Sequence, residues 1–187
     1  MRRAAAAVRA PSENQSGTTM EHLEDMLAIG QVLARYCRGV DRLDEELLRS
    51  AFWPDSFDDH GLFRGGREDF IAWVTTSMRE HYASTSFTLG QSYFEFRGER
   101  AAVETHFSGK GWGAGGKPQN FNALYGRYSD LFEKRAGEWK ILHRTVVYDG
   151  LVGGVASPLE FPHVHGERSS DDATYRIFDV VAPKIEN

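Results

Sequence analysis

The sequence lacks the features that mark several common protein classes. It has 187 residues and a single cysteine, Cys37, so it has no internal disulfide framework. No stretch reaches the roughly 18 consecutive apolar residues of a membrane-spanning helix. The chain also holds no phosphate-binding glycine loop, zinc-finger spacing or catalytic-serine motif. Any chemistry is therefore expected to use ordinary side chains, with no cofactor and no metal.

The charge of the chain and its single cysteine indicate which partners and which cellular compartment to expect. The net charge is −5 with both signs mixed along the chain, whereas nucleic acids and anionic membranes call for a basic face. We therefore expect neither nucleic acid nor membrane as a partner. Cys37 falls in an apolar helical pattern, which is typical of a small buried residue in a reducing cytoplasm.

The length is that of one domain. Residues 1–19 carry three arginines and no acid before Glu13, and they are expected to form a disordered N-terminal extension. Organised sequence runs over residues 20–150. Residues 151–187 are expected to be a C-terminal extension, mostly loop, with one short helix near "DDATYRIF".

Hydrophobic periodicity predicts helices first and strands afterwards. Apolar residues recur at helical spacing over residues 23–40, a second helix fits "DEELLRSAF", and a third covers residues 70–81. From residue 84 the pattern changes to four long segments rich in β-branched and aromatic residues, joined by hairpin-like turns. They are residues 84–96, 100–112, 120–134 and 138–150. This order predicts an α+β fold in which an antiparallel sheet, curled at internal glycines, packs helices on one face.

Two candidate site residues lie at the end of the first helix. Tyr36 and Asp41 are five residues apart, which is roughly 140° on a continuous helix, so they share a pocket only if the helix ends before Asp41. Asp41 could act as a base in a dry pocket. The alternative is that Asp41 caps the second helix and that Tyr36 is a core residue.

The "HR" pair of the last strand supplies two more candidates. His143 and Arg144 are neighbours on a strand, so their side chains point to opposite faces and only one of them lines the interior. Parity alone leaves that choice open. An inward arginine could hold a leaving group or a developing oxyanion, and the alternative is a surface salt bridge.

Other histidines are candidate bases because histidine titrates near neutral pH. His106 shares its strand face with Glu104 and Ser108, and His60 follows Asp58 and Asp59 where a strand should end at a cavity mouth. Each has a structural alternative. The pair His163 and His165 lacks a third metal ligand at a telling spacing, which favours a loop or interface role.

Three stretches carry a resemblance to a known family. They are "IGQVLARYCRGVDRLDEELLRSAFWPDS", "DDHGLFRGGREDFIAWV" and "YGRYSDLFEKRAGEWKILHRTVVYDG". Through them the chain resembles a SnoaL-like member of the nuclear-transport-factor-2-like superfamily, over residues 20–149. The resemblance implies a cone-shaped α+β barrel, in which a curled antiparallel sheet and three helices from the N-terminal half enclose an apolar pocket.

The resemblance also implies a chemistry. Superfamily lyases such as scytalone dehydratase, bile-acid 7α-dehydratase and hexachlorocyclohexane dehydrochlorinase use a His–Asp pair without a cofactor. Tyr36, Asp41 and Arg144 match positions of the family pattern. The family histidine does not, because Phe87 stands in its place in "FTLGQ". We expect His106 to replace it, while His60, His143, Asp41 alone or Tyr36 remain alternatives.

These expectations combine into one functional hypothesis. The chain is expected to be a cofactor-independent lyase, acting on a hydrophobic, aromatic or polycyclic hydroxylated substrate by loss of water or of formaldehyde. The alternatives are an isomerase or polyketide cyclase, and a non-catalytic binding module or small subunit of an oxygenase. A homodimer or homotrimer is expected. The catalytic candidates are Tyr36, Asp41, His106 and Arg144, and the substrate-binding candidates are His60, Phe87, Gln91, Tyr125 and His143.

Overall fold

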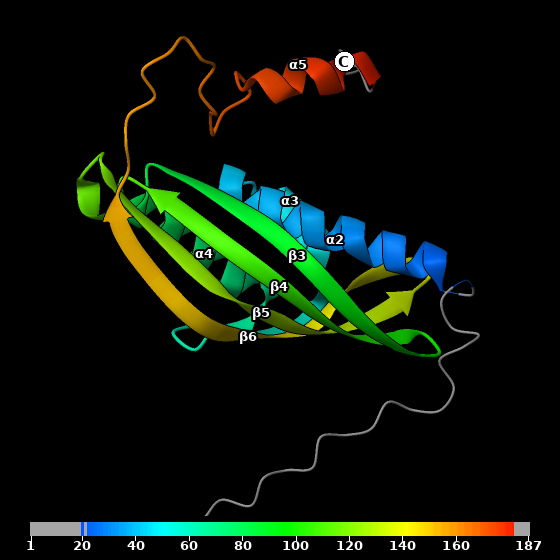
Figure 1. Ribbon diagram of the computed structural model, residues 1–187. Helices are drawn as coiled ribbons and strands as arrows, with labels where there is room; N and C mark the ends of the chain where they lie inside the picture. The colour runs from blue at the N-terminus through cyan, green and yellow to red at the C-terminus, as the bar shows by residue number, and fades with distance from the viewer. Residues whose placement is uncertain (1–19, 21, 182–187) are drawn as a thin grey trace, which may run out of the picture.

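The computed structural model describes residue 20 and residues 22–181 (Figure 1). The expected extension over residues 1–19 lies outside these residues, as do residues 182–187. The helices are α2 (Leu23–Arg42), α3 (Glu45–Ala51), α4 (Arg67–His81) and α5 (Ala173–Val181), with a short 3₁₀ turn η1 (Ala114–Gly116). The strands are β1 (Phe52–Asp59), β2 (Arg64–Gly66), β3 (Ser84–Arg97), β4 (Arg100–Trp112), β5 (Asn120–Arg135) and β6 (Glu138–Val155).

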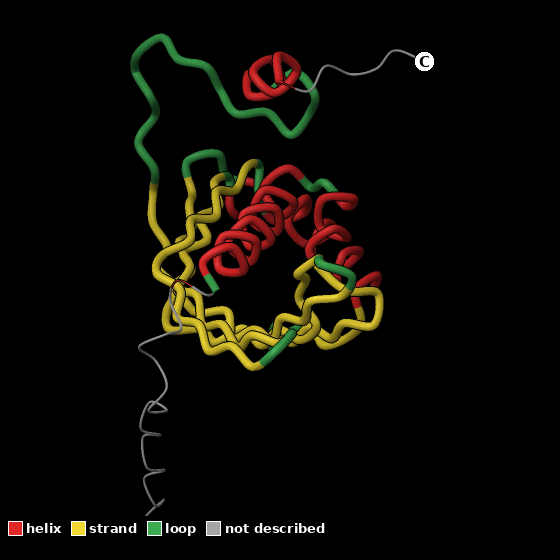
Figure 2. Tube along the Cα trace, turned by 90° about the vertical axis from the view of Figure 1, so that its right-hand side faces the viewer, coloured by secondary structure: helices red, strands yellow, loops and turns green. Residues whose placement is uncertain are grey.

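One sheet holds all six strands in the order β2-β1-β6-β5-β4-β3. It curls into a trough whose concave side holds α2, α3 and α4, while α5 lies outside it (Figure 2). The predicted α+β cone, closed by three helices from the N-terminal half, is therefore confirmed. The sheet is mixed rather than wholly antiparallel, because β1 enters beside β6 and runs parallel to it, with Asp58 opposite Arg144.

Helix α2 forms because its apolar residues repeat along one face. Ile29, Val32, Leu33, Tyr36 and Val40 are all at most 2% exposed, and they face the sheet. The helix continues to Arg42 and stops at Leu43, whose backbone is left-handed with φ 55°.

Gly39 does not end helix α2, although its position in the sequence suggests that it could. A Cβ at Gly39 would lie 2.8 Å from Cγ of Leu48, so this glycine allows α2 and α3 to pack closely. Asp44, not Asp41, caps α3, because its carboxylate accepts the backbone N–H of Leu47 at 2.9 Å. The alternative role of Asp41 as a cap is therefore wrong.

The interior of the cone is lined with aromatic side chains. Tyr36, Phe52, Phe70, Tyr128 and Phe132 are each at most 1% exposed. The rings of Phe70, Phe52 and Tyr128 all lie 5.4–6.2 Å, centroid to centroid, from another ring of this group. Such contacts fix the rings against one another, so the polar groups among them hold defined positions.

Gly126 is required where β5 bends. The register of β5 against β6 shifts between Tyr125 and Gly126, and a Cβ at Gly126 would lie 2.3 Å from the backbone oxygen of Val147. Gly126→Ala should therefore lower the free energy of unfolding by about 1–3 kcal/mol through overpacking. Gly150→Ala is the matched control, because nothing lies within 4 Å of its Cβ position. Equal denaturation midpoints for the two variants would contradict this role of Gly126.

The C-terminal region begins later than residue 151. Strand β6 extends to Val155, an irregular segment follows, and helix α5 starts at Ala173. The segment around Asp172 docks on the end of α2, where Asp172 pairs with Arg42 and Arg168 donates to the backbone oxygen of Asp41 at 3.3 Å. No helix among the described residues is long and apolar enough to cross a membrane.

Candidate active site

Six polar side chains from four parts of the fold meet inside the cone, and we call them the buried polar cluster. Helix α2 supplies one of them, strand β1 and its end supply two, β5 supplies two and β6 supplies one. They are Tyr36, Asp58, His60, Tyr128, Asp130 and Arg144, and none is more than 8% exposed. A group of this kind must be hydrogen-bonded or paired to be tolerated inside a protein.

Arg144 lies at the centre of the cluster, with no exposed surface. Its Nε and Nη2 donate to the two carboxylate oxygens of Asp130, at 2.8 and 2.7 Å, across the paired strands β6 and β5. Its Cζ lies 4.1 Å from the ring centroid of Tyr36 and 3.9 Å from that of Tyr128. Burial acts to lower the pKa of Arg144, but the Asp130 carboxylate outweighs it and holds that pKa well above its usual range. Arg144 is therefore a fixed positive charge between two aromatic rings.

Asp58 and His60 form a dyad, which we call the Asp58–His60 dyad. They are two residues apart at the end of β1 and point to the same face. Nδ1 of His60 donates to Oδ1 of Asp58 in a short hydrogen bond. An ionised carboxylate only accepts hydrogen bonds, so beside it a neutral imidazole takes the tautomer with the proton on Nδ1 and the lone pair on Nε2. An imidazole held in this tautomer by a carboxylate is the arrangement of a general base.

Tyr36 completes this arrangement. Its hydroxyl lies 3.4 Å from Nε2 of His60, on the side away from Asp58. Burial holds the pKa of Tyr36 far above its usual range, so its hydroxyl keeps its proton at neutral pH. His60 is 8% exposed, more than any other member of the cluster, and its ring stacks on Phe70 at 5.0 Å. The dyad therefore sits at the outer end of the cluster.

Two of the four predicted catalytic residues, Tyr36 and Arg144, lie in the cluster. Asp41 does not, because α2 continues past it and turns its side chain about 140° from Tyr36. Both carboxylate oxygens of Asp41 lie 3.1 Å from the backbone nitrogen of Phe87, which donates to them. Burial raises the pKa of Asp41, although the Phe87 N–H opposes the shift. Asp41 thus ties the end of α2 to the edge strand β3.

His106, the predicted replacement base, lies on the convex face of the sheet. Its neighbours Thr105 and Phe107 point inward and are at most 5% exposed, so His106 must point outward. It lines a shallow hollow of about 310 Å³ together with Tyr125 and Asp149. The structure therefore separates His106 from Tyr36 and Arg144 by the thickness of the sheet.

The substrate-binding candidates are also divided between the two faces. Phe87 packs inward against Phe107, with ring centroids 6.3 Å apart, and His60 belongs to the dyad. His143 lies outside and stacks on Phe57 at 5.5 Å, which is the face opposite to that of Arg144. Tyr125 is 45% exposed on the outer face, and Gln91 is exposed where the register of β3 shifts.

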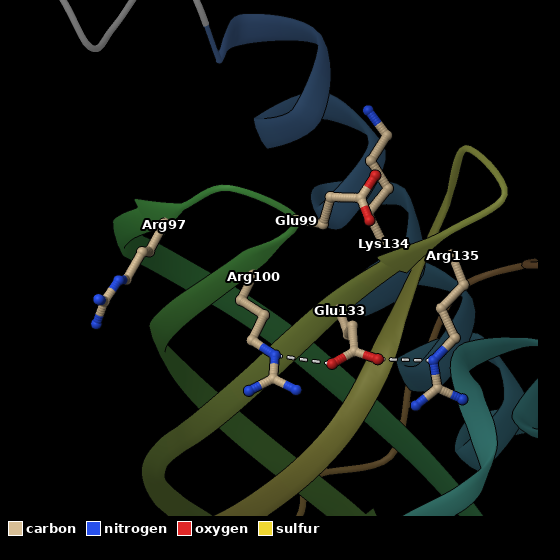
Figure 3. Close-up of a pocket in the computed structure, with 6 residues that line it drawn as sticks. All are labelled: Arg97, Glu99, Arg100, Glu133, Lys134 and Arg135. Carbon is tan, nitrogen blue, oxygen red and sulfur yellow. Dashed lines mark hydrogen bonds and ion pairs between the residues drawn. The ribbon is translucent and has the colours of Figure 1, made fainter.

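A larger hollow of about 620 Å³ lies at the tips of the β3–β4 and β5–β6 hairpins (Figure 3). Charged side chains line it, and Glu133 accepts from Nε of Arg100 at 2.8 Å and from Nε of Arg135 at 2.7 Å. Glu133 therefore pairs with both arginines, and the charged lining makes this hollow unsuitable for an apolar substrate. Among the described residues no group of three His, Cys, Asp or Glu side chains could hold a metal ion.

Three residues of the buried polar cluster were not predicted as site residues from the sequence: Asp58, Tyr128 and Asp130. Asp58 could have been found from its alternation with His60 in "DDH", since residues two apart on a strand share a face. Asp130 could not, because its partnership with Arg144 depends on the register of β5 against β6. Tyr128 alternates with buried neighbours in the same way as an ordinary core residue.

The docked C-terminal segment gives a prediction of its own. Arg42, with help from the N–H groups of Glu167 and Thr174, holds the pKa of Asp172 far below its usual range. A depressed pKa stabilises the docked state above the ordinary aspartate value of about 3.9, and this contribution is lost as the pH falls below it. Asp172→Asn should therefore speed amide exchange over residues 167–178 at pH 7, measured by mass spectrometry. Asp171→Asn, a change at an exposed neighbour, should leave that exchange unchanged, and equal effects would contradict the role of Asp172.

Comparison with known proteins places the fold. The model of the SnoaL-like domain matches residues 21–145. A scytalone dehydratase-like protein from Novosphingobium aromaticivorans superposes with a TM-score of 0.65 at 21% identity, over 78% of this chain and 100% of that chain. The LinA-type3 hexachlorocyclohexane dehydrochlorinase from Novosphingobium barchaimii superposes with a TM-score of 0.65 at 17% identity, over 79% of this chain and 100% of the other. A search of curated protein sequences gives no match. Because the family model covers well over half of the chain, this protein belongs to the SnoaL-like domain family.

Proposed function

We propose that this protein is a cofactor-independent lyase that removes water from a hydrophobic, hydroxylated aromatic or polycyclic substrate. The observation that carries the proposal is the Asp58–His60 dyad, whose Nε2 is hydrogen-bonded to the Tyr36 hydroxyl beside the fixed charge of Arg144. This gives a base, a proton donor and a cation within one aromatic-lined interior. Elimination next to an acidic carbon needs those three groups.

The proposed reaction moves one proton from carbon to the departing oxygen. Nε2 of His60 takes a proton from a substrate carbon, and the electron pair of that C–H bond forms the new double bond. The neighbouring C–O bond breaks, and the departing hydroxide takes a proton either from the His60 imidazolium directly or from Tyr36, which then regains a proton from His60, so that water leaves and both side chains return to their starting states. Asp58 stabilises the imidazolium, as a buried carboxylate does in other His–Asp pairs. Release of formaldehyde from a hydroxymethyl group is a variant that needs the same groups.

The names of the structural neighbours support an elimination. One is described as scytalone dehydratase-like and the other as a hexachlorocyclohexane dehydrochlorinase, and both names denote loss of a small molecule. This chain departs from the family pattern at Phe87, and the Asp58–His60 dyad is the base that we propose in its place. His60 is 8% exposed, more than any other residue of the buried polar cluster, so this base lies nearest to the solvent.

A substrate panel tests the proposal. Hydroxylated aromatic and polycyclic ketones are incubated with the protein and with His60→Gln, and the products are followed by mass spectrometry for loss of water and by a formaldehyde assay. We expect the wild-type protein to dehydrate at least one compound and His60→Gln to lose that activity. Products of unchanged mass would instead indicate an isomerase or cyclase.

A binding module is the second candidate, and one observation favours it. Phe87 stands at the position of the family histidine. Its backbone N–H donates to the Asp41 carboxylate, so the family's His–Asp pair is not formed here. In that case the protein would bind members of the panel without converting them, and His60→Gln would bind them equally well.

Asp41 separates this proposal from the family pattern. Asp41→Asn retains an oxygen that can accept from the Phe87 N–H, and Asp41 is not part of the buried polar cluster. Turnover by Asp41→Asn should therefore stay within about threefold of wild type, because the asparagine oxygen keeps the hydrogen bond to β3 and no reacting group is changed. A loss as large as that of His60→Gln would return Asp41 to the role of the base.

We further propose that the protein acts in the cytoplasm as a homodimer or homotrimer. The second half of β6 exposes Leu151, Val152 and Val155 by 54–73%, an apolar surface that a second copy could cover. Light scattering at micromolar concentration measures the oligomeric state, and a monomer would contradict the proposal.

A further inference from the structure

The chain turns sharply directly after His60, the base proposed above. The backbone N–H of Leu62 donates to the backbone oxygen of His60 at 2.8 Å, so only three residues form the turn, and Gly61 at its centre has φ 73°. A three-residue turn with positive φ is rare and strained. Strained backbone persists only where the surrounding structure holds it, and it gathers at functional sites. This turn therefore needs a group from another part of the fold to hold it.

Tyr148 of strand β6 contacts this turn in two ways. Its hydroxyl donates to the same backbone oxygen of His60, at 3.1 Å. Its ring lies beside Gly61, where Cε2 of Tyr148 is 4.0 Å from the position that a Cβ would take. Burial raises the pKa of Tyr148 to about 12, so the hydroxyl keeps its proton and remains a donor at neutral pH. Tyr148 thus holds the turn by a hydrogen bond and by packing.

The parallel pairing of β1 with β6 places Tyr148 beside the turn. Strand β1 ends at Asp59, which is paired with Thr145, whereas β6 continues to Val155. Tyr148 therefore lies beyond the last pair of the two strands. Because β1 has ended there, no strand lies between Tyr148 and the turn, and the side chain reaches the His60 oxygen directly.

A bulge in β6 lies next to Tyr148. On the other side of β6, Tyr148 pairs with Gly126 of β5, while Gly150 pairs with Tyr125. Asp149 between them has no partner in β5, so it is the extra residue of the bulge. Bulges are common beside active sites because they change the direction of neighbouring side chains. The bend of the sheet and the contact of Tyr148 with the turn thus occur at the same place.

We propose that Tyr148 is a positioning residue that holds His60 in the Asp58–His60 dyad. Because it acts through the proposed base, this role rests on the proposed function. Tyr148 exchanges no proton in the reaction. It fixes the backbone of His60, so that Nδ1 of the ring stays on the Asp58 carboxylate and Nε2 stays beside Tyr36. Without the hydroxyl, the His60 oxygen keeps only the Leu62 N–H, and the ring leaves Asp58 more often.

Nitrogen-15 NMR of the imidazole rings tests this role without a substrate. A protonated and an unprotonated ring nitrogen give well-separated signals, and His60→Gln assigns those of His60 by removing them. In wild type we expect a protonated Nδ1 and an unprotonated Nε2. Tyr148→Phe keeps the ring and removes the donor, so both signals should move toward the average of a ring that exchanges its tautomers. Tyr175→Phe, in helix α5 and outside the cluster, should leave them unchanged.

A second variant acts on the same turn through the backbone. Gly61→Ala meets no atom closer than 4.0 Å, but alanine disfavours φ 73°. It should therefore move the His60 signals in the same direction as Tyr148→Phe does. Melting curves establish that each variant is folded, so a change in the signals reports the turn and not unfolding.

Kinetics on a compound that wild type dehydrates complete the test. Tyr148→Phe should lower kcat about three- to tenfold, as the loss of one neutral hydrogen bond does, with KM close to that of wild type. Unchanged His60 signals, an unchanged kcat, or a higher KM alone would overturn the inference. Shifted signals in a protein that dehydrates no compound of the panel would support the role of Tyr148 and contradict only the proposed elimination.

Discussion

Asp130→Ala is expected to lower the free energy of unfolding by about 3–5 kcal/mol, because it leaves the Arg144 charge buried without a partner. Asp130 supplies both acceptors of the Arg144 side chain, and neither residue is more than 4% exposed. The free energy of unfolding of a small domain is only about 5–15 kcal/mol in total. Much of the Asp130→Ala variant should therefore unfold in mild denaturant.

A double variant distinguishes the unpaired charge from simple loss of contacts. Asp130→Leu combined with Arg144→Met replaces the pair with apolar side chains of similar size, and such replacements are often neutral or stabilising. We expect this double variant to unfold at a urea concentration close to that of wild type, and the single variant well below it. A double variant as unstable as Asp130→Ala would mean that the cavity, rather than the charge, dominates the loss.

Asp58→Asn is expected to lower kcat by about 10²–10⁴-fold, the range that general-base catalysis contributes. An asparagine no longer fixes the His60 tautomer with a proton on Nδ1, nor does it stabilise the imidazolium. The change should affect kcat more than KM, because Asp58 lies behind His60 and is 1% exposed, so that it does not touch the substrate.

Asp59→Asn is the matched control for this variant. Asp59 is the next residue on β1 and points to the other face, where its carboxylate pairs with Nε of Arg64 at 3.0 Å. The control should keep wild-type kcat. Similar losses in the two variants, or full activity in Asp58→Asn, would remove the Asp58–His60 dyad from the mechanism.

The elements of the fold were predictable from the sequence because their signals are local. The helical repeat in residues 23–40 and the change of period at residue 84 predict α2 and the four long strands correctly. The parallel pairing of β1 with β6 was not predictable, since it depends on which strand of the sheet is free at its edge. The same limit applies to Asp130 and Arg144, which meet only through the register of two strands.

The candidate site was predicted in part, for reasons that particular residues make clear. Arg144, rather than His143, faces the interior, as the resemblance implies and as parity alone could not decide. Asp41 was predicted in the site but lies outside the cluster. Gly39 allows close packing against Leu48 and does not end α2, so the helix continues to Arg42. His106 was also predicted in the site but lies outside the cluster. A polar strand face can line either solvent or a pocket, and the face that carries His106 is the convex, outer face of the sheet.

The central claim is that His60 is the base, and deuterium incorporation at carbon measures it most directly. A compound of the substrate panel that the protein turns over, or a slow analogue without the leaving hydroxyl, is incubated in D₂O and followed by proton NMR. The account predicts that wild type exchanges the carbon-bound proton for deuterium and that His60→Gln, although folded, does not. Exchange by His60→Gln at the wild-type rate would contradict the account and assign the base to another residue.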